Sequence, residues 1–325
     1  MNAGDVRQAK VDVAIGYEQR ADAAAAAVLR SLIDVVAFNI DGAIVGHDAE
    51  YLHQLRIAVR RSRTVQRQFR GVFPALELPG LRADFRWLQR ATGTARDLDV
   101  HVEEFAQLAE LVPESQRAAL EPLRVTLVAR RLDAREQLAR ALRSQRLQEL
   151  LADWERLLES LVELPVDDRP AAERSIGSLT GERVSAVYGR MLRMGEAIGP
   201  HSPAESYHEL RKRGKDLRYL LELFGVPLFD HDVVAPLVRT LKGLQDLLGR
   251  HQDREVQVAL VRSLADEVAA LPGGPSACLA MGVLIERLAA DEHAARREFP
   301  DRFRTLAGDE WRVQVAETFG RAESG

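Results

Sequence analysis

Basic side chains recur at helical spacing between residues 51 and 70 of this 325-residue chain, a stretch with six arginines and no carboxylate. Five of them follow one another at intervals of three or four residues: His53, Arg56, Arg60, Arg63 and Arg67. At about 100° per residue, these five side chains fall within an arc of roughly 80°. The opposite side carries the apolar residues Leu55, Ala58, Val59, Val65 and Phe69. The spacing predicts a helix with one packed face and one cationic face, the first basic stripe.

Like charges at helix positions i, i+3 and i+4 destabilise the helix by some tenths of a kcal/mol per pair. A solvated helix face is the ordinary interpretation of a charged run, but such a face normally carries acidic partners at these spacings. The repulsion would be relieved by an external polyanion or by acidic residues on neighbouring helices. We interpret the stripe as an anion-binding surface, on which histidine donates to phosphate and is protonated more readily beside the anion.

The same pattern returns in the second part of the chain, where SYHELRKRGKDLRYLLELF aligns with YLHQLRIAVRRSRTVQRQF. It gives a second basic stripe, consisting of His208, Arg211, Lys215 and Arg218. Three acids dilute it, namely Glu209, Asp216 and Glu222, the last standing where the first copy has Arg67. We therefore expect the first half to bind anions more strongly.

A second pair of segments matches as well, RWLQRATGTARDLDV (86 to 100) with KGLQDLLGRHQDREV (242 to 256). Arg86 aligns with Lys242, and Gly93 with Gly249. Glycine inside a helix costs about 1 kcal/mol relative to alanine, so these glycines indicate a close helix crossing or room for a ligand. Asp97 and its counterpart Asp253 are expected to fix a neighbouring Arg or His by a charge-assisted hydrogen bond.

Two further arginines are candidates for an anionic partner. The apolar run of Leu127, Ala134, Leu138 and Ala141 predicts that Arg131 lies on an inward seam, and Arg287 matches it in the last helix. A guanidinium on a core seam needs an anion, which could be one of the aspartates or a bound phosphate.

The hydrophobic periodicity predicts an all-α fold, because alternating strand patterns are nearly absent while Ala, Leu, Arg, Glu and Gln dominate 3.6-residue periods. Gly, Pro and Asp clusters separate eight helices, four before Pro165 and four after Pro170. The fourth, about residues 114 to 164, would be unusually long or kinked. With the repeats, this predicts two pseudo-symmetric four-helix bundles from an internal duplication, residues 1–165 and 166–325, with a basic groove between them.

Composition limits the function. The single cysteine, Cys278, excludes an internal disulfide and a thiolate metal site and favours a reducing compartment. The first residues lack the apolar region of a signal peptide, and no eighteen apolar residues run together, so neither secretion nor membrane insertion is expected. The net charge of −4 rules out a bulk polycation, so anion binding must depend on where the charges lie.

Catalytic signatures are weak in this sequence. HExxH, GxxxxGK[ST] and GxSxG motifs are missing, and aromatic residues are too sparse for base-stacking platforms. The dipeptide His47-Asp48 is similar to that of metal-dependent phosphohydrolases, but it lies in a predicted turn with no further histidine at a ligand spacing. We therefore expect no catalytic residue, metal or cofactor.

Four segments carry a resemblance to a known family: HQLRIAVRRSR, LQRATGTARDLDV, HELRKRGKDLRYLLELF and LKGLQDLLGRHQDREV. From about Tyr17 to Leu306, the sequence resembles the CHAD family. The resemblance implies two helical bundles around a basic cavity and a non-enzymatic module that binds inorganic polyphosphate at cytoplasmic polyphosphate granules. It places ligand contacts on both basic stripes, with weaker ones at Arg86, Lys242, Arg131 and Arg287. Some family members are fused to a CYTH-type triphosphatase, whose ExExK signature does not occur here.

Three alternatives remain open from the residues alone. A basic groove would also accept nucleic acid, although the sparse aromatics make this partner unlikely. An enzyme of the metal-dependent phosphohydrolase type would act on polyphosphate or nucleotides. A structural adaptor would use the same cations for acidic protein partners, such as proteins of the granule.

Overall fold

The computed structural model describes residues 6–320 of the chain, and this part is helical without a β-strand. The predicted all-α class is therefore confirmed. The first half contains α1 (Ala21–Val45), α2 (Ala49–Gln68), η1 (Arg70–Val72), α3 (Leu78–Ala91), α4 (Gly93–Glu103), α5 (Phe105–Ala109), α6 (Glu114–Arg117), η2 (Ala118–Leu120), α7 (Glu121–Leu142) and α8 (Gln145–Ser160). The second half contains α9 (Ile176–Glu196), α10 (Ala204–Leu220), η3 (Leu221–Gly225), α11 (Val226–Leu228), α12 (His231–Ser263), α13 (Ala265–Ala269), α14 (Gly274–Ala307) and α15 (Asp309–Phe319).

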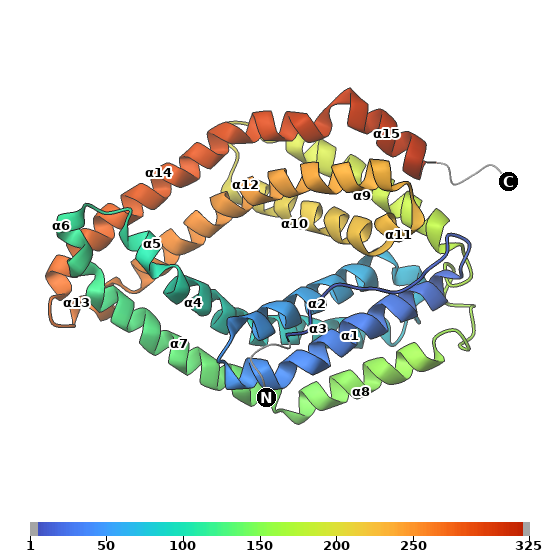
Figure 1. Ribbon diagram of the computed structural model, residues 1–325, viewed down its shortest axis with the longest axis horizontal. Coiled ribbons are helices and arrows are strands. Elements are labelled where there is room, and N and C mark those ends of the chain that lie inside the picture. Colours follow the sequence, from blue (N-terminus) through green and yellow to red (C-terminus); the bar gives the residue numbers. More distant parts are fainter. Residues whose placement is uncertain (1–5, 321–325) are drawn as a thin grey trace.

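The two helices that carry the basic stripes, α2 and α10, lie in the middle of an elongated molecule (Figure 1). α2 packs against α1 and α10 packs against α9, while the two basic helices also touch each other. The long pair α12 and α14 forms one edge of the molecule, and α1, α7 and α8 lie toward the other (Figure 1). Each basic helix thus packs on the helix that precedes it in the chain, and the duplication of the sequence stays a prediction.

Two predicted helix boundaries are wrong. The segment from 114 to 164 is not one helix, because α7 ends before Arg143 and α8 begins after Ser144. The side chain of Ser144 caps α8 by accepting a hydrogen bond from the Leu147 N–H. The segment from 86 to 100 is also divided. Thr92 ends α3 and turns its Oγ1 back to the Leu88 carbonyl at 2.8 Å, and α4 begins at Gly93.

The turn between α1 and α2 fixes the direction of the first basic stripe. Gly46 adopts a left-handed backbone conformation with φ of 74°, which residues with a Cβ rarely adopt. Its N–H donates a hydrogen bond to the Gly42 carbonyl and so ends α1. Asp48 caps α2 by accepting the Glu50 N–H at 2.8 Å. A Cβ at Gly42 would lie 2.3 Å from the ring of Tyr51, so the two helices approach closely here. The apolar face of α2 is therefore pressed onto α1, and the stripe points away from it.

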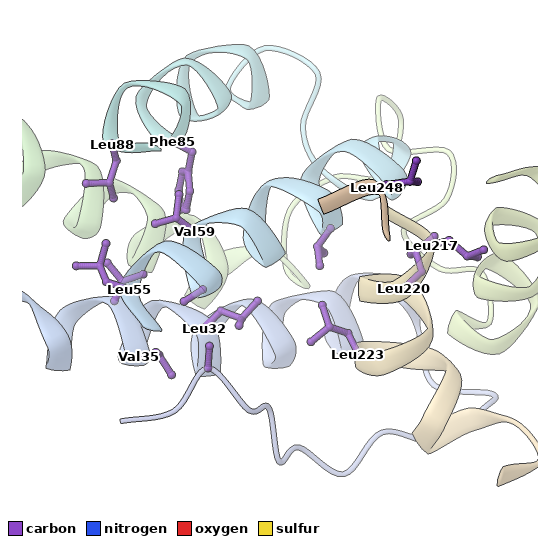
Figure 2. Close-up of a cluster of buried hydrophobic side chains, with 14 of the residues drawn as sticks. Leu32, Val35, Leu55, Val59, Phe85, Leu88, Leu217, Leu220, Leu223 and Leu248 are labelled. Carbon is purple, nitrogen blue, oxygen red and sulfur yellow. The ribbon is translucent and has the colours of Figure 1, made fainter. Parts of the chain in front are cut away.

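Buried apolar side chains from both halves form one continuous core (Figure 2). Leu55 and Val59 of α2 lie in it with Leu32 of α1, and Leu217 and Leu220 of α10 belong to the same cluster. The relative position of α2 and α10 is consequently fixed by core packing, which is as dense as an organic crystal.

Helix α1 is the one helix within residues 6–320 that is long and apolar enough to cross a membrane, because its most apolar stretch of 18 residues has a mean hydropathy of 1.7. Of that stretch, 56% is buried inside the protein, and Leu29 and Leu32 are fully buried. These features are those of a core helix against which α2 and α8 pack.

Candidate functional site

The two basic stripes meet at a cavity of about 630 Å³ between α2, α4, α10 and α12, which we call the central cavity. Its basic side chains are His53, Arg56, Arg60, Arg96, His101, Arg211, Lys215 and Arg218. Its carboxylates are Asp97 of α4, Glu104 directly after α4, and Asp246 and Asp253 of α12. The cations of the stripes thus come from α2 and α10, whereas the acids share their part of the lining with Arg96 and His101 of α4.

A second cavity of about 380 Å³, the adjoining cavity, shares Arg60, Arg211 and Lys215 with the central cavity. Seven Lys and Arg side chains line it, together with His208: Arg60, Arg63, Arg67, Arg211, Lys212, Arg213 and Lys215. Asp216 is the one carboxylate among its lining residues within the described chain. The adjoining cavity therefore has a large excess of positive charge.

Lys215 and Arg60 lie at the junction of the two cavities. Burial and the charges of Arg211, Arg60 and Arg218 together lower the pKa of Lys215 to about 7, because a further cation is costly in a desolvated cationic site. The buried Nε atoms of Arg60 and Arg211 have no hydrogen-bond partner within residues 6–320, whereas Nε of the nearby Arg218 lies 3.4 Å from a carboxylate oxygen of Glu222. Buried donors are normally paired, so this junction is suited to an anionic acceptor.

The glycines of the second repeated block lie beside arginines of the stripes. A Cβ at Gly93 would lie 3.6 Å from Nη1 of Arg56, and a Cβ at Gly249 would lie 3.4 Å from Nη2 of Arg211. Each half thus places a glycine beside the first arginine of its stripe. The two expectations for these glycines, a close helix crossing or room for a ligand, stay predictions, since the atoms nearest to each glycine belong to an arginine side chain.

Neutral groups hold several arginines in place, and such groups do not neutralise the charge of a guanidinium. Arg56 donates Nη1 to the Gln89 carbonyl and to Oγ1 of Thr92, both at 3.0 Å, and burial lowers the pKa of Arg56 to about 10. Arg63 donates to the side-chain oxygen of Gln89, and Arg211 to that of Gln252 at 3.2 Å. These guanidinium groups remain strongly cationic because arginine keeps its proton at neutral pH.

Part of the stripe's charge is neutralised from the other half. Arg67 of α2 forms an ion pair with Asp216 of α10, and the neighbouring Arg61 pairs with Glu222 at 2.5 Å. The acids that dilute the second stripe in the sequence therefore compensate arginines of the first half. The sequence predicted that the repulsion between the arginines is relieved by an external polyanion or by acidic residues on neighbouring helices. For Arg61 and Arg67, acidic residues of the other half have this role.

The two histidines occupy different cavities, His53 the central one and His208 the adjoining one. Burial lowers the pKa of His53, and the charge of Arg96 adds to this effect. His53 is consequently neutral at pH 7 in the free protein and can donate through only one ring nitrogen.

The aspartates beside the stripes are weaker anchors than expected. Asp253 lies 3.7 Å from Nη2 of Arg211, which is an ion pair without a hydrogen bond, and its side chain is 63% exposed. Asp97 is exposed and acts on Arg56 only by its charge, which partly opposes the lowering of the arginine's pKa by burial.

Four predicted contacts lie outside both cavities. Arg86 and Lys242 are exposed, although Arg86 borders a smaller passage beside the adjoining cavity. The core-seam prediction for Arg287 is wrong, because α14 turns Leu284 and Leu288 inward and leaves Arg287 in water. Arg131 is half-buried and lines no described cavity. The arginine of α7 that reaches a buried carboxylate is Arg135, which forms an ion pair with Asp99 at 2.6 Å.

The cavities also contain basic residues that were not predicted as contacts, namely Arg96, His101, Lys212 and Arg213. Arg96 belongs to the polar stripe around Gly93, so its helical spacing could have indicated it. Lys212 and Arg213 lie beside the second stripe by sequence, but their approach to the first stripe depends on how α10 packs on α2. Within residues 6–320, no group of His, Cys, Asp and Glu side chains is placed to hold a metal ion.

Comparison with known proteins adds three findings. Residues 27–262 match the sequence model of the CHAD domain. Two uncharacterized proteins of Mycobacterium tuberculosis, MT2285 and Rv2226, are each 29% identical over 231 residues; these cover 66% of this chain and 40% of the relative's length. The chain thus spans well under half of these relatives.

Two solved structures share the fold. The crystal structure of the CHAD domain from the plant Ricinus communis superposes with a TM-score of 0.74 at 24% identity, covering 96% of this chain and 97% of that one. PptA from Streptomyces chartreusis gives a TM-score of 0.69 at 19% identity, covering 88% and 99% of the two chains. At these identities, the likeness concerns the fold.

Proposed function

Because the chain belongs to the CHAD domain family, we propose that it is a non-enzymatic module that binds inorganic polyphosphate across the central and adjoining cavities. The observation that carries the proposal is the convergence of both basic stripes on cavities that share Arg60, Arg211 and Lys215. Successive phosphates of a linear chain would meet successive cations. One bound phosphate raises the effective concentration of the next, so long chains bind more tightly than short ones.

Arginine and lysine have different tasks in this proposal. The guanidinium groups of Arg56 and Arg63 are oriented by Gln89, and each can offer two parallel donors to phosphoryl oxygens. Lys215 supplies a compact charge that can follow the chain, because its ammonium donates in three directions. The cellular part of the proposal, cytoplasmic location at polyphosphate granules, is supported by the family resemblance.

The test is a titration with long-chain polyphosphate at several salt concentrations. Affinity should fall steeply as salt increases, because binding releases counterions from the polymer. An affinity indifferent to salt would contradict the electrostatic mechanism. Displacement by DNA or RNA at equal phosphate concentration would favour a nucleic-acid ligand, and phosphate release on adding magnesium or manganese would favour a phosphohydrolase. Capture of acidic proteins without polyphosphate would favour an adaptor.

The decisive variant is the triple substitution of Arg56, Arg60 and Arg63 by alanine. We expect affinity to fall more than about a hundredfold, since hydrogen bonds to charged groups contribute roughly 1.5–3 kcal/mol each. A matched control removes three exposed arginines of α14 that make no ion pair within the described chain: Arg287, Arg297 and Arg302. Equal losses in the two triple variants would mean that only net charge matters. Circular dichroism checks that helicity is retained.

A further inference from the structure

The adjoining cavity continues toward the outer surface through residues that neighbouring cavities share. Arg63 and Arg67 line both the adjoining cavity and a narrow passage of about 20 Å³. Arg82 and Arg86 of α3 line both that passage and a pocket of about 470 Å³ at the surface, the outer pocket. A row of shared arginines thus connects the central region with a pocket between η1 and α3.

This row is almost free of neutralising acids. Arg67 is paired with Asp216, but Arg70, Arg82 and Arg86 form no ion pair within residues 6–320. Burial lowers the pKa of Arg82, and the charges of Arg67, Arg86 and Arg70 lower it further. Crowded cations that receive no internal compensation indicate a surface that is completed by an external anion.

A buried amide in the passage adds an independent observation. Gln66 lines the passage and is fully buried, yet neither its Nε2 nor its Oε1 has a hydrogen-bond partner in the described structure. A buried amide without hydrogen-bond partners destabilises the folded protein. A phosphoryl oxygen at the passage would accept from Nε2 and relieve part of that destabilisation.

The opposite end of the central cavity has the reverse character. Glu104, Asp246 and Asp253 line both the central cavity and a neighbouring pocket. The arginines of that pocket are already paired, Arg250 with Glu298 and Arg254 with Asp291, each at 2.6 Å. A polyanion that left the cavity at this end would meet the carboxylates of Glu104 and Asp246, and that of Asp253, which lies 3.7 Å from Arg211; these carboxylates repel it.

We propose that a long polyphosphate chain leaves the cavities in one direction only, past Arg63 and Arg67 and over α3, and that it ends in the outer pocket at Arg82, Arg86 and Arg70. This inference rests on the proposed function and extends it to chain length. The passage is narrow, but the side chains of Arg82 and Arg86 can turn aside without breaking an ion pair. Asp168 stands at the far side of the outer pocket, where its Oδ2 accepts the Ala75 N–H at 3.0 Å, and its charge marks the end of the path.

The expected signature is a two-stage dependence on chain length. Tripolyphosphate is short enough to be held in the central and adjoining cavities alone, so it does not need the outer arginines. Long-chain polyphosphate gains the outer contacts in addition. Replacing Arg82 and Arg86 by glutamine should therefore lower the affinity for long chains by about tenfold and reduce the slope of log affinity against log salt by about 2. The affinity for tripolyphosphate should stay the same.

The control is the double variant Arg297→Gln, Arg302→Gln, which removes the same charge from α14. If the two double variants bind long chains equally, the exit path is wrong although polyphosphate binding stands. If the α3 variant also loses tripolyphosphate, these arginines act in the cavities themselves and the inference fails. If wild type binds neither polyphosphate, the proposed function fails as well. A loss confined to nucleoside triphosphates would make the outer pocket a nucleotide site instead. Thermal melting by circular dichroism establishes that the variants are folded.

Discussion

Lys215 couples anion binding to pH. In the free protein its pKa is lowered to about 7, so near neutral pH a substantial fraction of the side chain is uncharged. A bound polyanion favours the ammonium form and raises this pKa. Binding therefore takes up a proton above pH 7, and affinity should weaken as pH rises from about 6 to 8.5. Calorimetry in buffers of different ionisation enthalpy measures the proton uptake.

The matched variant is Lys215→Arg, which stays charged throughout this range. It should bind with little change between pH 7 and 8.5. His53 contributes separately, because its pKa is lowered from 6.5 and it gains charge only in more acidic solution. A wild-type affinity that is constant from pH 6 to 8.5 would contradict the coupling.

At the scale of the helices, α2 and α10 are joined by ion pairs that also limit the site. Asp216 of α10 accepts hydrogen bonds from Arg67 and Arg213, and burial raises the pKa of this carboxyl against the effect of both arginines. Its charge lies in the adjoining cavity, where it competes with an anionic ligand. The acid thus stabilises the junction of the helices at the expense of ligand affinity.

The substitution Asp216→Asn separates these two effects. We expect several-fold tighter polyphosphate binding and a decrease in the free energy of unfolding of about 1–3 kcal/mol, because Arg67 and Arg213 lose their charged partner. The control Asp99→Asn removes another buried, arginine-paired carboxylate that lies outside both cavities. It should lower stability without changing affinity. Weaker binding in Asp216→Asn would mean that the acid orients the arginines for the ligand.

The sequence predicted what depends on spacing within one helix. The stripe of Arg56, Arg60 and Arg63 and the apolar face behind it follow directly from the period of 3.6 residues. Gly249 lies inside α12 as the sequence predicted, whereas Gly93 is the first residue of α4, because the break at Thr92 depends on how the side chain of that threonine folds back onto α3. The pairing of Arg67 with Asp216 could not be predicted, because it depends on the approach of α10 to α2 in the folded chain. The error at Arg287 has the same origin, since a small rotation of α14 decides whether that residue faces the core or water.

At the scale of the whole molecule, the connection between the two halves is part of the core. Arg169 lies in the segment between α8 and α9, yet its side chain is fully buried and lies 3.4 Å from the buried Asp22 of α1. It also donates Nε to the Pro165 carbonyl at 2.9 Å. Ala171 donates its N–H to the Gly71 carbonyl at 2.9 Å, which attaches the same segment to η1. The connection is thus anchored to the first half at several points.

Loss of this anchor should destabilise the entire protein. Replacing Arg169 by methionine leaves Asp22 buried with Arg20 as its remaining partner, 2.8 Å away. Breaking a buried ion pair by removing one partner costs about 3–5 kcal/mol, so we expect the midpoint of guanidinium unfolding to fall markedly. Removing Arg174, whose pairing with Glu182 is exposed, is the control and should cost about 1 kcal/mol or less. Similar midpoints for the two variants would contradict a structural role for Arg169.

The continuous core also predicts that the halves unfold together. Trp87 and Trp154 report on the first half and Trp311 on the second, so variants that keep only one set of tryptophans separate the two signals. In each variant, we expect the fluorescence transition to coincide with the loss of helicity by circular dichroism, because neither half can expose its share of the core without disrupting the other. Two resolved transitions would instead establish 1–165 and 166–325 as independent domains. In that case the cavities between α2 and α10 could open by separation of the halves, and a long polyphosphate chain would enter from the side without being threaded.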